Sequence, residues 1–183
     1  EEVFLSHSYY PPGLLTNEML RDAAGNKFSE SNNTYELRAV RDSVFFPALL
    51  RNDRWIYEGK ATSGASTYMQ YDYDAFGNIN KLSDAGNGTP QDLLTAKISY
   101  HNNEAAYLKN SPSEVIVTTA EGTKRRRTTA IDSKGHLTQV RAFLADGTSA
   151  NYDLEYDEYG NLSKLLRPAN YRGQRMFYQY AYD

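Results

Sequence analysis

Cysteine is absent from this 183-residue sequence. The chain therefore has no disulfide framework, no thiolate nucleophile and no cysteine-based zinc site, and it is compatible with oxidising and reducing compartments alike. No run approaches the roughly 18 consecutive apolar residues of a membrane-spanning helix. The formal net charge is only −3, so no bulk electrostatic attraction to nucleic acid or anionic membrane is expected.

The common catalytic motifs are also missing. The sequence has no Gly-x-Ser-x-Gly, Walker loop, Gly-x-Gly-x-x-Gly or His-Glu-x-x-His. The histidines His7, His101 and His136 are scattered, with no spacing typical of metal ligands. We therefore expect a non-enzymatic chain without catalytic residues, metal or cofactor. Because the chain begins at Glu1 with no signal-peptide pattern, we interpret it as a piece of a longer protein whose targeting signal lies outside it.

Aromatic residues are plentiful, and one short phrase recurs around them. With 16 Tyr and 7 Phe, the chain has enough aromatic side chains for a packed structure. Residues 71–82 read YDYDAFGNINKL and residues 154–165 read LEYDEYGNLSKL. The copies share their motif residues at equal positions: Tyr73 with Tyr156, Asp74 with Asp157, Gly77 with Gly160, and Asn78 with Asn161.

Weaker copies extend the repeat along the chain. One lies at Asp22 to Asn26, a second runs from Asp132 through Gly135, and Tyr182-Asp183 opens a further copy. Asp132, Asp157 and Asp183 are separated by 25 and 26 residues. A unit of about 26 residues holds two strands of 8 or 9 residues plus two turns.

The recurring phrase has the chemistry of a tight turn. An aspartate at the first position accepts hydrogen bonds from backbone N–H groups two residues on, and the glycine supplies a positive φ. The flanking residues are rich in Tyr, Thr, Val, Ile and Leu, which favour strands. The sequence therefore predicts an all-β fold, an antiparallel meander of hairpins that forms a curved, open sheet.

The two halves of the chain differ in regularity. We expect irregular repeat units over residues 1–66 and a regular meander over 67–183, together one continuous structural unit. In the first half, Val44 to Leu50 and Trp55 to Glu58 suggest a hairpin around Asn52-Asp53. Leu14 to Leu20 is compatible with either a strand or a short helix.

Tyrosines at i and i+2 lie on one face of a strand, so the repeat predicts an aromatic ladder across strands. Two uses are open. The rings can pack cross-strand with wet hydroxyl groups, or they can stack on a ligand. The ligand-stacking candidates are Tyr71, Tyr156 and Tyr180.

Three other patterns give only weak predictions. Asp72-x-Asp74 resembles the start of a calcium loop, but Phe76 and Ser83 stand where oxygen ligands belong. The basic run Lys124 to Arg127 alternates between two faces, which favours a solvated strand over a phosphate site. Glu155 and Asp157 are a carboxylate pair, but Asp157 belongs to the turn.

The phrases at 73–79 and 156–162 resemble the YD repeat of the Rhs family, which includes bacterial polymorphic toxins, the B and C components of insecticidal toxin complexes, SpvB-like proteins and the animal teneurins. The resemblance implies a β-sheet strip that winds into a shell around a toxin polypeptide. It implies structural roles for the matched residues, namely Tyr73, Asp74, Gly77, Asn78, Asp132, Gly135, Tyr156, Asp157, Gly160, Asn161, Tyr182 and Asp183.

From this resemblance we expect a structural segment of a secreted or surface-exported bacterial protein, whose partners are the rest of that protein and an enclosed toxin polypeptide. Nucleic acid and a membrane span are not expected. Edge-to-edge self-association is a hazard of an open sheet. The alternative function is carbohydrate binding or adhesion through exposed tyrosine rows.

Overall fold

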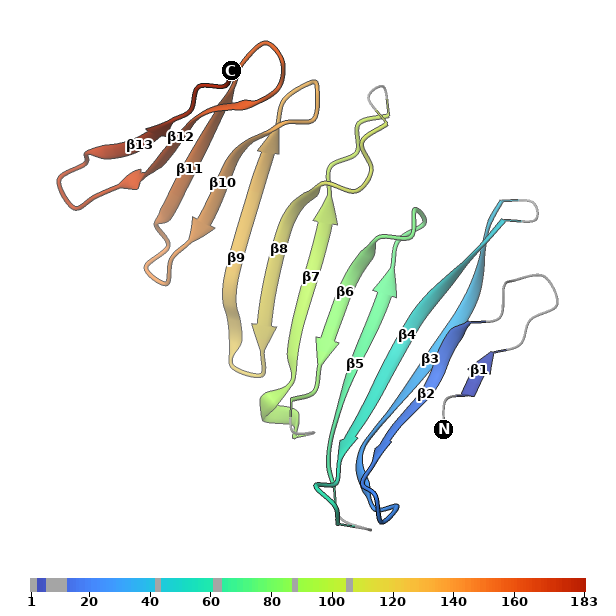
Figure 1. The fold of residues 1–183 in the computed structure, drawn as a ribbon. Helices are drawn as coiled ribbons and strands as arrows, with labels where there is room; N and C mark the ends of the chain where they lie inside the picture. The colour runs from blue at the N-terminus through green and yellow to red at the C-terminus, as the bar shows by residue number, and fades with distance from the viewer. Residues whose placement is uncertain (1–2, 6–12, 42–43, 61–63, 87–88, 105–106) are drawn as a thin grey trace. The chain divides into compact units, whose positions relative to one another are not determined.

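The fold of the chain is a β-meander. A computed structural model describes residues 3–5, 13–41, 44–60, 64–86, 89–104 and 107–183. It contains thirteen strands and one 3₁₀ turn, with no α-helix among the described residues. Within each half of the chain the strands follow one another in chain order, and their pairs are antiparallel (Figure 1). The prediction of an all-β antiparallel meander is confirmed.

The contacts divide the chain into two compact units. One comprises Glu1–Thr95 with Thr119–Glu121, and the other comprises Ala96–Thr118 with Gly122–Asp183. We refer to them as unit 1 and unit 2. The boundary predicted between residues 66 and 67 separates irregular from regular copies of the motif, and it stays a prediction.

Six strands lie in unit 1: β1 (Val3–Leu5), β2 (Leu14–Arg21), β3 (Lys27–Arg41), β4 (Val44–Ile56), β5 (Ala65–Tyr73) and β6 (Ile79–Asp84). The 3₁₀ turn η1 (Pro90–Asp92) and β7 (Leu94–Tyr100) come next. The later strands are β8 (Pro112–Thr119), β9 (Gly122–Ile131), β10 (Leu137–Phe143), β11 (Ser149–Tyr156), β12 (Leu162–Ala169) and β13 (Arg175–Gln179). Residues 14–20 are therefore a strand, and the helical alternative is wrong.

The hairpin predicted around Asn52-Asp53 is also wrong, because β4 runs unbroken through both residues. The Asn52 amide donates to Ser31 Oγ and to Asn33 Oδ1 on β3, each at 2.7 Å. Asp53 accepts from the Arg51 guanidinium at 2.7 Å. These partners satisfy side chains that elsewhere favour turns, so the strand continues.

In part of each unit, polar cross-strand pairs lie on one face of the sheet and apolar pairs on the other. Cross-strand partners share a face and neighbours along a strand alternate. In unit 2 the register pairs Val140 with Tyr152, and Leu154 with both Leu165 and Tyr178. The opposite face pairs Gln139 with Asp153 and Glu155 with Lys164. Unit 1 repeats the pattern, with Tyr71 opposite Leu82 and Asp72 opposite Lys81.

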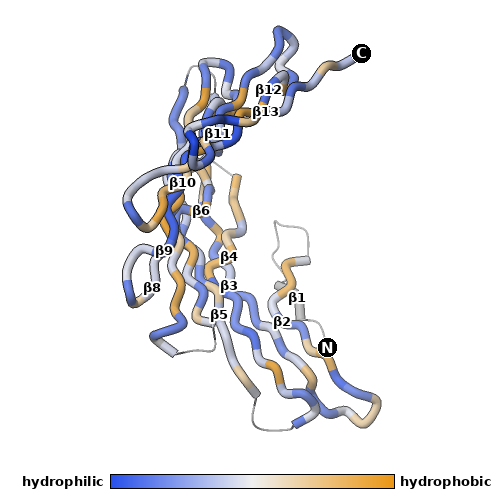
Figure 2. Tube along the Cα trace, turned by 90° about the vertical axis from the view of Figure 1, so that its left-hand side faces the viewer, coloured by the Kyte–Doolittle hydropathy of each residue, from blue (hydrophilic) through white to orange (hydrophobic). Residues whose placement is uncertain are grey.

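Side chains on both faces are mostly half-buried. The buried hydrophobic residues of the described chain are three alanines: Ala48, Ala85 and Ala96. Figure 2 shows hydrophobic and hydrophilic positions interspersed along the strands of both units. Within the described residues, no helix has the length and hydropathy of a membrane span. Each unit is therefore held together by cross-strand pairs and by its turns, with no thick interior.

Candidate functional site at the aspartate turns

The clearest motif copy forms a five-residue turn closed by one carboxylate. After β5, Asp74 Oδ1 accepts the backbone N–H groups of Phe76 (2.8 Å) and Asn78 (2.9 Å), and Oδ2 accepts the Asn78 side-chain amide (2.9 Å). The Gly77 N–H donates to the Asp74 carbonyl at 3.2 Å, and Gly77 has a φ of 84°. Only glycine adopts that φ without steric cost, which explains its place in the phrase.

The same construction recurs at Asp157 and Asp22. Asp157 Oδ1 accepts from the N–H groups of Tyr159 (3.0 Å) and Asn161 (2.8 Å), and Oδ2 accepts the Asn161 amide (3.1 Å). Asp22 makes the equivalent bonds to Ala24 and Asn26. In all three copies the asparagine four residues after the aspartate donates its side-chain amide to the second carboxylate oxygen.

At Asp132 a histidine takes the place of the asparagine. His136 donates its backbone N–H to Asp132 Oδ1 (2.9 Å), and its Nδ1 lies 3.0 Å from Oδ2. The imidazole also stacks on the Tyr156 ring, with centroids 4.7 Å apart and planes 22° from parallel. Gly135 has the same positive φ, 92°. The substitution therefore preserves the turn and adds an aromatic contact between neighbouring strands.

Two further turns share the backbone pattern but were not assigned to the motif from the sequence. Asn170 Oδ1 accepts from the N–H groups of Arg172 (2.9 Å) and Gln174 (3.0 Å). Leu144 begins another turn, in which Asp146 instead accepts from Thr148. Asn170 lies 13 residues after Asp157, half a repeat unit, and asparagine forms the same local turn as aspartate. That half-unit spacing was the missed signal.

Hydrogen bonding fixes the charge state of the turn aspartates. Burial raises the pKa of Asp74. Hydrogen bonds from the Asn78 amide and from the N–H groups of Asn78, Phe76 and Gly77 together lower it by more, so the net pKa lies below the ordinary value. The net direction is the same for Asp132 and Asp157. For Asp22 the largest cause is the Asn26 side chain, which lowers the pKa. All four are carboxylates near neutral pH.

Acid should therefore destabilise the fold. A carboxyl group whose pKa is lower in the folded state stabilises above its unfolded pKa, about 3.9, and that stabilisation is lost as pH falls through the folded value. We expect the free energy of unfolding to be flat from about pH 7 to 5 and to fall below about pH 4. Urea unfolding at each pH, monitored by circular dichroism, measures this free energy. The double variant Asp74→Asn, Asp157→Asn should show a shallower acid loss, and an unchanged slope would contradict this assignment.

Three motif tyrosines bind a backbone carbonyl group of a preceding strand. Tyr73 donates its hydroxyl to the Leu49 carbonyl on β4, Tyr156 to the Leu137 carbonyl on β10, and Tyr182 to the Leu162 carbonyl on β12, each at 2.9 Å. Burial raises the pKa of both Tyr73 and Tyr156. Cross-strand packing with wet hydroxyl groups was one of the two uses that the sequence left open, and in this structure the three hydroxyl groups bind backbone carbonyls instead.

The three ligand-stacking candidates differ in environment. Tyr156 is half-buried, with one ring face against His136. Tyr71 is half-buried and donates to the Met69 sulfur at 3.4 Å. Tyr180 is 40% exposed. The structure does not bring the three side chains together into one platform within a unit, since Tyr71 belongs to unit 1 and the other two to unit 2.

A half-open groove of about 410 Å³ adjoins the Asp74 turn. Its walls include Arg38, Phe46, Tyr73 and Phe76. The Phe46 and Tyr73 rings meet edge to face at 5.5 Å, and the Arg38 guanidinium lies 5.4 Å from the Tyr73 ring centroid. Asp74 is the carboxylate in the lining, and both of its oxygens are already bound within the turn.

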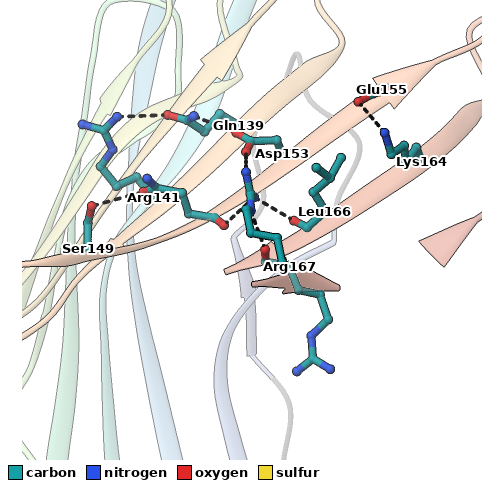
Figure 3. Close-up of polar contacts among 10 residues, drawn as sticks. Gln139, Arg141, Ser149, Asp153, Glu155, Lys164, Leu166 and Arg167 are labelled. Atoms are coloured by element: carbon teal, nitrogen blue, oxygen red, sulfur yellow. Dashed lines mark hydrogen bonds and ion pairs between the residues drawn. The ribbon is translucent and has the colours of Figure 1, made fainter. Parts of the chain in front are cut away.

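The polar face of unit 2 carries a connected network, part of which is drawn in Figure 3. Gln139 donates to Asp153 Oδ1 at 2.7 Å. Arg175 donates to Asp153 Oδ2 at 2.5 Å, to the Arg167 carbonyl at 2.8 Å and to the Asn151 carbonyl at 3.0 Å. This one guanidinium connects β11, β12 and β13. Sequence reasoning missed it, because its partners lie on other strands.

The weaker sequence patterns fall on ordinary sheet positions. Lys164 pairs with Glu155 at 3.3 Å (Figure 3), while Asp157 belongs to its turn. Within the basic run, Arg126 pairs with Glu114 at 2.8 Å, and the run is exposed. In the part of the chain that the structure describes, no three His, Asp or Glu side chains are grouped as metal ligands.

Comparisons with known proteins give only distant likenesses. No family model matches the chain, and no curated protein sequence matches it. A porin-like protein from Bacteroides uniformis is similar over 87% of this chain and 86% of its own, with 11% identity and a TM-score of 0.32. A chain of the TcdB2–TccC3–Cdc42 complex is similar over 93% of this chain, with 10% identity and a TM-score of 0.35. This chain spans 10% of that chain's length.

Proposed function

We propose that this chain is a non-enzymatic structural segment of a secreted or surface-exported bacterial protein, in which its sheet forms part of a wall that encloses or presents a toxin polypeptide. The observation that carries the proposal is that the motif's polar side-chain atoms form hydrogen bonds within the sheet and its turns. In Asp74 and Asp157, both carboxylate oxygens accept hydrogen bonds from their own turns. The hydroxyl groups of Tyr73 and Tyr156 donate to the preceding strand.

The two faces of the sheet support a wall. A wall separates two environments, and at the β5–β6 and β11–β12 pairs an ion pair lies on one face of the sheet while Tyr71 with Leu82 and Leu154 with Leu165 lie on the other. An exposed apolar face binds apolar surface of another polypeptide, because burying it releases water. The rest of the parent protein and the enclosed polypeptide are the partners we propose for these faces.

The test is protease protection in the natural full-length protein. We expect an enclosed polypeptide to resist a protease that digests it readily once it is separated. The double variant Asp74→Ala, Asp157→Ala should open the wall and expose the polypeptide, whereas Asp72→Ala, which removes a carboxylate outside the turn, should keep the protection. A polypeptide digested equally fast in the wild type and in isolation would refute the proposal.

Carbohydrate binding is the second candidate, and one observation favours it. Three tyrosines near the end of the chain have exposed rings, with exposed fractions of 52% for Tyr178, 40% for Tyr180 and 56% for Tyr182. Aromatic rings of this kind can stack on sugars. A glycan array should separate the candidates, because tight binding lost in Tyr180→Ala would favour this one. At Tyr71 and Tyr156, which are half-buried, stacking on a sugar stays a prediction.

A further inference from the structure

A polar groove of about 320 Å³ lies over β3 in unit 1, between side chains of β2 and β4. The register places Glu18 on β2 opposite Ser31 on β3, and Ser31 opposite Arg54 on β4. These three side chains therefore share one face of the sheet, with the short serine between two long residues. The groove is the space that the short side chain leaves between its longer neighbours.

The two walls of the groove carry opposite charges that are available to a ligand. Glu18 and Arg54 are both exposed, and within the described residues neither side chain forms a hydrogen bond or an ion pair. The third charged residue of the lining, Glu30, is already engaged, because its carboxylate accepts from Lys27 at 2.8 Å and from the Tyr57 hydroxyl at 3.3 Å. A ligand with a single charge would use only one wall, whereas a zwitterion matches both.

The floor of the groove adds hydroxyl groups and an apolar end. Ser31 Oγ accepts the Asn52 amide at 2.7 Å, so the Ser31 hydroxyl hydrogen is able to donate. Ser29 lies two residues earlier, on the same face of β3. Its cross-strand neighbours are Leu20 and Ile56, which are 61% and 43% exposed. A ligand in the groove would therefore meet charges at one end and apolar side chains at the other.

We propose that this groove binds an α-amino acid with an apolar side chain, its ammonium group on Glu18 and its carboxylate on Arg54. Strands two apart in a sheet are separated by about 9.5 Å. Two charge-assisted hydrogen bonds of about 2.8 Å leave about 4 Å between the bound atoms, and an ammonium and a carboxylate on the same carbon atom span about 3–4 Å. The ligand's apolar side chain then lies toward Leu20 and Ile56.

An NMR titration of the 183-residue chain with L-leucine tests the site. We expect saturable shifts of the backbone amide signals of Glu18, Ser31 and Arg54, with a Kd of about 1 mM, because exposed ion pairs hold a ligand weakly. The compound 4-methylpentanoate lacks the ammonium group, and leucinol lacks the carboxylate. Each should bind about tenfold more weakly than L-leucine, because one hydrogen-bonded charge pair is lost.

Two variants connect each wall to one charge of the ligand. Glu18→Gln should bind L-leucine no better than 4-methylpentanoate, and Arg54→Gln should bind it no better than leucinol. Asp72→Asn removes a carboxylate elsewhere in unit 1 and should keep the wild-type affinity and preference. A folded wild-type chain without saturable shifts would overturn the proposal. A preference for L-leucine over 4-methylpentanoate that persists in Glu18→Gln would overturn it too, because the ammonium group would then bind elsewhere.

Discussion

Replacing Asp74 by alanine is expected to lower the free energy of unfolding of unit 1 by about 3 kcal/mol. The carboxylate accepts three hydrogen bonds, from Phe76 N, Asn78 N and Asn78 Nδ2. Hydrogen bonds to a charged group contribute about 1.5–3 kcal/mol each, and water replaces part of what is lost at a partly exposed turn. Without the carboxylate, the turn between β5 and β6 loses the three hydrogen bonds that fix its shape.

Asp72 supplies the matched control for that change. It lies two residues earlier on β5, and its removal changes the net charge equally. Its carboxylate pairs with Lys81 at 3.4 Å, with 49% and 42% of the two side chains exposed. An exposed pair of this kind contributes about 0.5 kcal/mol.

Urea unfolding at pH 7 measures both variants by circular dichroism. A large loss in Asp74→Ala with almost none in Asp72→Ala identifies the turn bonds as the cause. Equal losses in the two variants would show that the charge, and not the turn, governs stability.

Local rules predicted the turns because every partner lies within four residues of the aspartate. The same rules missed the side-chain hydrogen bonds that link one strand to another. The Tyr73 hydroxyl binds a carbonyl 24 residues earlier, and the Arg175 guanidinium binds a carboxylate 22 residues earlier. Such contacts depend on register, which a single sequence specifies only weakly where both faces are half-exposed.

The misassigned hairpin at Asn52-Asp53 has the same origin. Asparagine and aspartate favour turns when they bind their own backbone. On β4 they bind side chains instead, and Asn33 on β3 carries the amide oxygen that receives Asn52. Paired polar residues on adjacent long strands therefore extend a sheet, while a single aspartate followed by glycine three residues later ends a strand.

Replacing Gly135 by alanine is the second change with a large expected effect, about 2–4 kcal/mol in unit 2. The residue has a φ of 92°, where an alanine costs about 1 kcal/mol. A Cβ atom at Gly135 would lie 2.5 Å from Leu108 Cδ1, so the leucine must also move. Overpacking of this kind costs about 1–3 kcal/mol more.

Gly147 separates the two contributions, because its φ is 83° and a Cβ atom there would meet nothing within 4 Å. Gly147→Ala should therefore cost only the backbone strain, about 1 kcal/mol. In a Leu108→Ala background the clash is gone, so Gly135→Ala should then cost no more than Gly147→Ala does. Thermal and urea unfolding of this double-mutant cycle give the coupling between residues 108 and 135. A coupling of zero would mean that Leu108 does not pack over the turn, and that the fourth position requires glycine for its φ alone.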